Sequence, residues 1–231
     1  MSILNKIKTT FDDFLSPPYC LINGEPIYDE SLFFSQKGID NFNLAPEPDV
    51  LLNRFIDNFG IMHNYIDCYH SLLSLKENRN YLNVIHQFKY YNLTKVAETL
   101  GSYLSKKIEM ESDLVFDYIV PVPIHSAKKR ERGYNQSTFI ADAISKSTNI
   151  KMNESLVKRI VYTKSQTQLS SNKRQSNVEG IFAVIDPNKI FGKRILIVDD
   201  VITTGATINS LAKVLKEAEV KYISACSIAI S

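Results

Sequence analysis

Apolar residues in the second half of the chain alternate between strand-like runs and helix-like periods. Short apolar runs bounded by Pro, Gly or charged residues predict buried strands. Such runs occupy residues 114–123, 181–185, 192–200 and 221–230. Apolar positions at helical spacing predict helices over 136–148 and 205–218. Strands that alternate with helices in this way are typical of an α/β fold, a wound parallel sheet with flanking helices.

The first third is less regular and predicts an appendage to this domain. Residues 16–50 are rich in Pro, Asn and Asp and show no sustained period. Helical spacing returns at 50–66, then after residue 79 through Leu82, Ile85 and Phe88, and again over 93–108. We therefore expect a small irregular and helical N-terminal appendage over 1–78 and the α/β domain over 79–231.

The first residues, MSILNKIKTTFDDFLSPP, place apolar side chains at helical spacing before two prolines. This pattern predicts a short amphipathic helix that packs against its own protein or a partner, or lies on a membrane surface. The stretch lacks the continuous apolar core of a secretion signal. No apolar run approaches the roughly 18–20 residues of a membrane span, so we expect that this is not an integral membrane protein.

Composition narrows the class of protein further. An apolar share of 44% is ample for a packed core. Because the net charge is only +2, nucleic-acid binding would have to rest on local basic clusters. The three scattered cysteines, Cys20, Cys68 and Cys226, are too few for a disulfide framework. They fit a reducing compartment, and we expect a cytoplasmic protein.

The stretch ILIVDDVITTGAT, residues 195–207, combines a buried strand with two carboxylates and a turn that opens a helix. Ligands of open α/β sheets bind at the carboxyl ends of strands, where Asp199 and Asp200 lie. Backbone N–H groups at a helix start bind phosphate, Gly205 allows close approach, and threonine hydroxyls add donors. The loop residues are Thr203, Thr204, Gly205, Ala206 and Thr207. Two carboxylates beside a phosphate site are explained if they accept hydrogen bonds from sugar hydroxyls or meet a divalent cation. The pattern therefore describes a ribose 5-phosphate site.

A simpler interpretation is that the aspartates end a strand and cap a helix. A cap needs one aspartate and no cluster of threonines, so this interpretation explains less of the pattern. A nucleotide P-loop is excluded because the G-x-x-x-x-G-K-[ST] spacing and its lysine are absent.

A second stretch, VPVPIHSAKKRERGYNQS at 120–137, joins a strand end to a basic loop. Four basic residues surround Glu131, namely Lys128, Lys129, Arg130 and Arg132. Such a cluster can hold pyrophosphate or a nucleic-acid backbone, or it can be a solvated face. His125 next to it either assists binding or is a turn residue.

ILIVDDVITTGAT closely resembles the phosphoribosyl pyrophosphate (PRPP) motif of type I phosphoribosyltransferases. The resemblance implies a type I phosphoribosyltransferase-like fold that binds PRPP together with Mg²⁺. In that family two acidic residues bind the ribose hydroxyls and can meet the metal, which implies these roles for Asp199 and Asp200. The ligand-binding set implied by the motif continues through Val201, Thr203, Thr204, Gly205, Ala206 and Thr207.

The basic stretch PVPIHSAKKRERGYNQ resembles the signature of the ComF family, phosphoribosyltransferase-like proteins linked to natural competence. The stretch at 165–182 resembles the same family's pattern of Gln and Leu, then Arg, Asn and Gly-x-Phe. The matching positions are Gln168, Leu169, Arg174, Asn177, Gly180 and Phe182. In type I enzymes this region contains a loop that closes over the reacting centre.

Residues 14–28 resemble the family's entry into an N-terminal zinc ribbon, which a C-x-x-C-G knuckle usually opens. Cys20 is present here, but Asn23 stands at the second cysteine position before Gly24. A four-cysteine site needs four thiolates, so the sequence predicts a degenerate, metal-free ribbon. A mixed site of Cys20 with His63, Cys68 and His70 is the alternative.

Three functions follow from these stretches. The first is a ComF-like protein that binds Mg-PRPP and handles incoming single-stranded DNA, with basic loops at 128–132 and 158–174 and the aromatic Tyr134 and Tyr162. The second is an active enzyme that moves phosphoribosyl from PRPP to an unidentified acceptor, where Arg130, Arg132 and Lys129 neutralise the leaving pyrophosphate. The third is a regulator that senses PRPP and contacts protein partners through the N-terminal helix. Competence-machinery proteins are expected among the partners.

Overall fold

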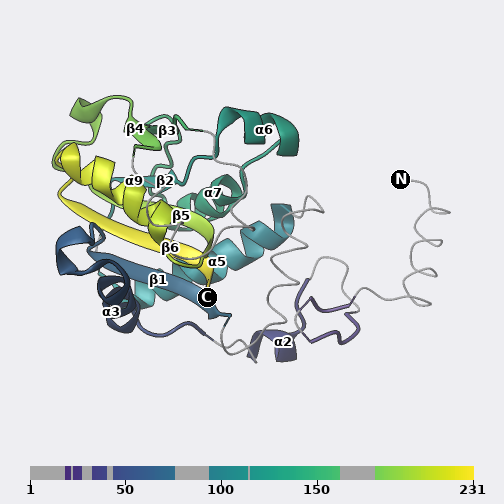
Figure 1. Cartoon of the computed structure of the whole chain (residues 1–231). Coiled ribbons are helices and arrows are strands. Elements are labelled where there is room, and N and C mark those ends of the chain that lie inside the picture. The colour runs from purple at the N-terminus through teal and green to yellow at the C-terminus, as the bar shows by residue number, and fades with distance from the viewer. Residues whose placement is uncertain are drawn as a thin grey trace.

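A computed structural model describes residues 19–21, 23–27, 33–40, 44–75, 94–113, 115–161 and 180–231. Its central feature is a parallel sheet of four strands in the order β1-β6-β5-β2 (Figure 1). The strands are β1 (Cys68–Ser74), β2 (Tyr118–Pro121), β5 (Arg194–Ile202) and β6 (Tyr222–Ile230). Two shorter strands, β3 (Val157–Arg159) and β4 (Phe182–Val184), pair antiparallel in a second sheet.

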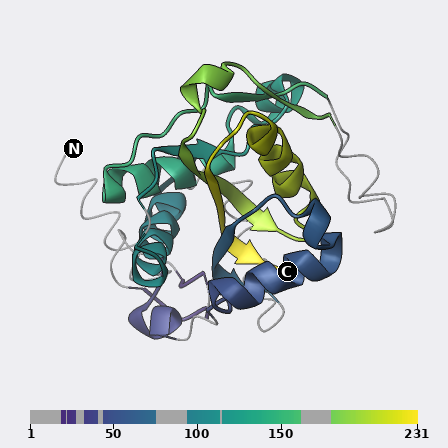
Figure 2. The same ribbon diagram turned by 90° about the vertical axis from the view of Figure 1, so that its left-hand side faces the viewer.

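Helices cover both faces of the parallel sheet (Figure 2). One face packs against α5 (Thr94–Glu111) and α7 (Gln136–Thr148). The other packs against α3 (Pro48–Phe59) and α9 (Ala206–Glu217). A parallel sheet requires this cover because its strands are apolar on both sides. The predicted wound α/β fold is confirmed.

The apolar part of the strand that leads to the acidic pair is fully buried. In β5, Ile195 to Val198 are at most 1% exposed, as the run of four apolar residues predicted for an interior strand. The strand does not end at the aspartates, as the sequence suggested, but continues to Ile202. It continues because β6 runs beside it, pairing Val201 with Ala229 and Ile202 with Ile230.

The sheet also contains a strand that the sequence pattern did not reveal. β1 pairs with β6 from Cys68 through Ser74, on the N-terminal side of the predicted boundary at residue 78. The polar residues His70, Ser71 and Ser74 hide this strand in the sequence, although all three are buried. The division into two domains stays a prediction, and this pairing places part of the N-terminal segment within the sheet.

Most other predicted elements lie close to their expected positions. Helix α7 has the predicted bounds, α5 and α9 agree within a few residues, and α3 accounts for most of the stretch 50–66. The basic stretch expected as a loop instead forms a short helix, α6 (Ser126–Arg132), closed by Gly133 at a φ of 82°. Three smaller helices in the described residues are α2 (Gln36–Asp40) and the 3₁₀ helices η1 (Ile61–His63) and η3 (Pro187–Lys189).

Several predictions fall on residues outside the described part of the chain. They are the N-terminal amphipathic helix, the first helix expected between residues 79 and 93, and most of the proposed lid at 165–182. Among the described residues, the structure contains no helix long and apolar enough to cross a membrane.

The close approach of α5 and α7 leads to a first prediction. A Cβ on Gly101 would lie 2.6 Å from Cβ of Ala143 and 3.2 Å from the backbone O of Ile140. Gly to Ala inside a helix usually stabilises by about 0.5–1 kcal/mol. For Gly101→Ala we instead expect a loss of about 1–2 kcal/mol, because the overpacked helices must separate. Urea denaturation monitored by circular dichroism measures the change.

Combining Gly101→Ala with Ala143→Gly is the control, because the second change removes the atom that the new methyl meets. The double variant should be more stable than the sum of the two single changes predicts. Simple additivity would contradict the proposed contact.

Candidate functional site

The acidic pair lies near the carboxyl end of β5, and its backbone and side chains are held by hydrogen bonds. Both Asp199 and Asp200 are part-exposed. Oδ1 of Asp199 accepts from Oγ of Ser137 and from the backbone N–H of Asp200, each at 2.9 Å. Oδ1 of Asp200 accepts from the backbone N–H of Val201 at 2.7 Å. The carboxylates are therefore positioned before any ligand binds.

Ser137 is a contact that the sequence alone did not single out. It lies in the first turn of α7 and is buried, and its hydroxyl donates to Asp199 across 62 residues of sequence. The residue belongs to the quoted stretch at 120–137, but only the fold shows that this helix start meets β5.

The predicted phosphate loop follows directly after β5. Gly205 caps α9 in the left-handed conformation, with a φ of 77°. The hydroxyl of Thr204 accepts from the backbone N–H of Ala206 at 3.4 Å. Thr203 is exposed and Thr207 is part-exposed. The first N–H groups of α9 lack partners within the helix, and the helix dipole favours an anion at this end.

Helix α3 supports this loop from behind. A Cβ on Gly205 would lie only 1.9 Å from Cε1 of Phe55, so the ring occupies the space beside the glycine. Phe55 is buried and its ring also contacts Tyr69 of β1, with 4.6 Å between centroids. Glycine is therefore required at 205 both for its backbone conformation and for the contact with Phe55.

A second link joins the N-terminal segment to α9. Oδ1 of Asn209 accepts from the backbone N–H of Tyr65 at 3.0 Å, and its Nδ2 donates to the backbone O of His63 at 2.8 Å. The segment after α3 is thus tied to the helix whose start carries the proposed phosphate site.

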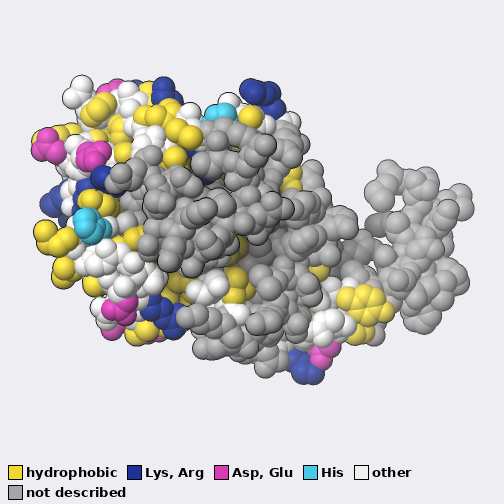
Figure 3. Space-filling model, viewed as in Figure 1, with side chains coloured by type: hydrophobic (Ala, Val, Ile, Leu, Met, Phe, Trp, Pro, Cys, Tyr) yellow, Lys and Arg dark blue, Asp and Glu magenta, His cyan; other side chains and the backbone are white. Residues whose placement is uncertain are grey.

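The basic residues lie on α6, the short helix that precedes α7 in the chain. Lys129 and Arg130 are exposed, and Lys and Arg side chains stand at the surface over this helix (Figure 3). Nζ of Lys129 lies 4.0 Å from Oε2 of Glu154. The side chains of Lys128 and Arg132 fall outside the described ones. His125 caps α6, since its Nδ1 accepts from the backbone N–H of Ala127 at 3.2 Å.

Arg159 is a cation near the acidic pair. The sequence indicated only that it belongs to the basic stretch 158–174. It lies at the end of β3, and its guanidinium stacks over the ring of Phe182 at 5.6 Å. Burial lowers the pKa of the guanidinium, and the charge of Asp199 acts in the opposite direction. The interaction places a positive charge within electrostatic reach of Asp199.

The acidic pair fits a magnesium ion chemically. Mg²⁺ prefers oxygen ligands and is usually bound by one or two carboxylates together with waters and substrate phosphates. Asp199 and Asp200 offer adjacent, part-exposed carboxylates beside a loop suited to phosphate. These are the residues that would hold the ion.

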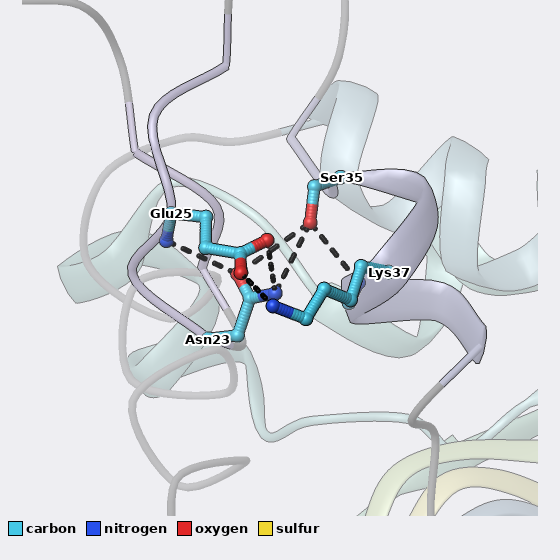
Figure 4. Close-up of polar contacts among 5 residues, drawn as sticks. Asn23, Glu25, Ser35 and Lys37 are labelled. Carbon is cyan, nitrogen blue, oxygen red and sulfur yellow. Dashed lines mark hydrogen bonds and ion pairs between the residues drawn. The ribbon is translucent and has the colours of Figure 1, made fainter.

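The segment expected as a degenerate zinc ribbon is held by hydrogen bonds (Figure 4). Oδ1 of Asn23 accepts from the backbone N–H of Glu25 at 3.1 Å, and its Nδ2 donates to Oγ of Ser35 at 3.2 Å. Lys37 forms an ion pair with Glu25. Sγ of Cys20 is packed where a side chain on Gly38 would lie, 2.7 Å from such a Cβ.

The mixed metal site considered from the sequence is not formed in the described part of the chain. No group of three His, Cys, Asp or Glu side chains suited to a metal ion is found there. Cys68 and His70 are neighbours on β1, but Cys20 is packed against Gly38 and the backbone of His63 is bonded to α9. The ribbon itself stays a prediction.

Comparison with known proteins fits this arrangement. Residues 135–230 match the family model described as "Phosphoribosyl transferase domain", a range that includes α7, β5, the loop and α9. Competence protein F of Haemophilus influenzae is 30% identical over 151 residues, or 63% of this chain and 66% of that protein. The chain is a ComF homologue with a phosphoribosyltransferase domain.

Two further proteins are similar to this ComF homologue. The DNA utilization protein YhgH of Escherichia coli K12 is 30% identical over 136 residues, which are 57% of this chain and 59% of that one. The chain thus spans less than two thirds of the length of these two curated relatives. A solved structure, the glutamine PRPP amidotransferase of B. subtilis, is 20% identical, with a TM-score of 0.42, over 62% of this chain and 30% of its own.

The contact between Gly205 and Phe55 leads to a second prediction. Gly205→Ala should cost about 2–5 kcal/mol of stability, because the methyl group combines left-handed strain with overpacking. Gly192→Ala is the matched control: Gly192 has a φ of 66°, but nothing lies within 4 Å of its added Cβ. The control should lose only the strain, about 1–2 kcal/mol. Equal losses in urea denaturation would contradict a tight contact with Phe55.

Proposed function

We propose that this ComF homologue binds PRPP, or a ligand with a ribose 5-phosphate moiety, together with Mg²⁺ at the loop between β5 and α9. The observation that carries the proposal is the combination of a prepositioned acidic pair with a helix start. Asp199 and Asp200 lie shortly before Thr203 to Thr207 in the chain. Gly205, in the left-handed conformation, directly precedes the first backbone N–H groups of α9.

Each part of the ligand has a matching group. The 5-phosphate accepts hydrogen bonds from the backbone of Gly205, Ala206 and Thr207 and from threonine hydroxyls. The ribose hydroxyls donate to Asp199 and Asp200. Ser137 and the backbone N–H of Asp200 both donate to Oδ1 of Asp199 and so fix the orientation of this carboxylate. Bound Mg²⁺ would neutralise charge on the pyrophosphate.

Binding of Mg-PRPP tests this assignment. Calorimetry should detect binding by the full chain, and Asp199→Asn combined with Asp200→Asn should weaken it by at least about a hundredfold, since two hydrogen-bonded charged groups are lost. Glu109→Gln combined with Asp113→Asn is the control, because it removes two exposed carboxylates at the end of α5. Absence of binding by the unchanged protein would refute the proposal.

For the biological role, we assign this ComF homologue to natural competence, with single-stranded DNA as its partner in the cytoplasm. The names of the two relatives, competence protein F and DNA utilization protein, support this assignment. The exposed Lys129 and Arg130 of α6 offer charge to a phosphate backbone, and part-exposed Tyr134 follows the helix. Competence-machinery proteins are further partners under this proposal.

Salt dependence tests the DNA interface. For single strands the log–log slope of affinity against salt is about −0.7 per phosphate contact, so neutralising four contacts should reduce its magnitude by about 3. The variant changes Lys128, Lys129, Arg130 and Arg132 to Gln. A control changes four exposed lysines elsewhere to Gln, namely Lys95, Lys146, Lys189 and Lys221. Equal slopes in the two variants would exclude α6 as the interface.

The alternative is catalysis, transfer of phosphoribosyl from PRPP to an unidentified acceptor with release of pyrophosphate. In that case Arg130, Arg132 and Lys129 are the groups assigned to the leaving pyrophosphate, and the charge of Arg159 near Asp199 favours the same chemistry. Pyrophosphate released from Mg-PRPP in the presence of candidate bases, and lost on changing Asp199 and Asp200, would establish this function over binding alone.

A further inference from the structure

Three side chains outside the proposed PRPP site form a relay at the beginning of β1. Sγ of Cys68 lies 3.4 Å from Nε2 of His70. Nδ1 of the same imidazole lies 2.6 Å from Oε2 of Glu111. A nucleophile, a histidine and a carboxylate in this order are the arrangement that activates thiols in proteins.

The fold explains why these groups meet. Cys68 and His70 are two residues apart on one strand, so both side chains point to the face covered by α5. Glu111 is the last residue of α5 and reaches back to the strand. The side chains of His70 and Glu111 are 0% and 6% exposed, whereas Cys68 is part-exposed. The cysteine residue is therefore part-exposed while the two groups that support it are buried.

The charges around the sulfur favour the thiolate. Burial alone raises the pKa of the Cys68 thiol, but the hydrogen bond and charge of His70, with weaker hydrogen bonds from Tyr222 and Ser224, bring the pKa below its ordinary value. Burial likewise opposes protonation of His70, but Cys68 and Glu111 raise its pKa to about 9. The hydrogen bond between the two groups therefore favours the thiolate of Cys68 and the protonated form of His70.

The other titratable groups around the pair lie on α5, at the start of β6 and just before β1. Lys107 forms an ion pair with Glu111, which keeps that carboxylate ionised. Tyr222 of β6 stays protonated, because burial first, and then the charge of Cys68, raise the pKa of its hydroxyl. Asp67 precedes β1 and bonds to Nζ of Lys216 at 2.6 Å. Its charge is thus already paired.

The remaining cysteines are more deeply buried than Cys68. Cys20 and Cys226 are only 3% and 0% exposed, and each lies within a hydrophobic core cluster. Cysteines buried in apolar surroundings are unreactive, so both are packing residues. They provide internal references for the reactivity of Cys68 within the same molecule.

We propose that Cys68 is a nucleophilic modification site that forms a mixed disulfide with low-molecular-weight disulfides. The Cys68 thiolate attacks one sulfur of the disulfide, a new S–S bond forms, and the original S–S bond breaks. The other sulfur leaves with the electron pair and takes the proton from His70, so Cys68 is oxidised and the departing thiol is reduced. Glu111 positions the imidazole for both steps.

This site is separate from the proposed PRPP site. Cys68 begins the edge strand β1, whereas the acidic pair lies near the carboxyl end of β5, two strands away in the sheet. The proposal for Cys68 is therefore independent of whether the protein binds PRPP.

Labelling of the native, full-length protein with iodoacetamide across a pH series tests reactivity. Mass spectrometry of peptides should show Cys68 modified at least about tenfold faster than Cys20 or Cys226 at pH 7, since an ordinary thiol is then only a few per cent thiolate. Its rate should stay high below the pH at which an ordinary thiol, with a pKa of about 8.5, is protonated. Incubation with oxidised glutathione should add one glutathione, at Cys68.

A matched pair of substitutions on α5 tests the relay. Glu111→Gln should slow labelling at pH 7 by about threefold to tenfold and shift the pH profile upward, because loss of the carboxylate lowers the pKa of the imidazolium and thereby raises that of the thiol. Glu109→Gln, two residues earlier and exposed, should leave the profile unchanged. A purely structural role for Glu111 would alter stability without moving the pH profile.

Three results would overturn the proposal. They are labelling of Cys68 no faster than that of the two buried cysteines, an ordinary thiol pH profile in the native protein, and identical profiles for the two glutamine variants. The first two come from the unchanged protein, so they remain decisive even if a substitution impairs folding.

Discussion

The position of β5 between β6 and β2 is the constraint on which the proposed PRPP site depends. Its apolar residues are buried on both faces, so the strand can lie only in the interior of the sheet. That position leaves Asp199 and Asp200 near the carboxyl end, where α7 and α9 both begin close to the strand. The starts of α7 and α9 and the two carboxylates therefore lie together at this end of β5, because the apolar part of the strand is buried inside the sheet.

The N-terminal third takes part in this arrangement more directly than its composition indicates. β1 extends the sheet beyond β6, and α3 packs over β1 so that Phe55 reaches the loop at Gly205. The ComF homologue therefore uses residues before its phosphoribosyltransferase domain to support the loop within it. The same strand also carries Cys68 and His70, so β1 contributes to both of the proposed sites.

The hydrophobic periodicity of the sequence was sufficient to predict the helices with one apolar face, such as α7 and α9, and the strand with two buried faces, β5. The motif at 195–207 likewise placed the acidic pair and the loop correctly on adjoining elements. β1 was not predicted because its buried positions include the polar residues His70 and Ser71, which bond to partners from α5 and β6. Ser137 and Arg159 could not be assigned either, since their proximity to Asp199 arises from contacts between segments far apart in the sequence.

The side chain of Asn209 has a consequence for how motion spreads through the protein. It accepts from the amide of Tyr65 and donates to the carbonyl of His63, so it bridges segments more than 140 residues apart. Any local opening of α9 must release that amide to solvent. Hydrogen exchange at the backbone amide of Tyr65, in the N-terminal third, would therefore report local opening of the helix that follows the proposed phosphate loop.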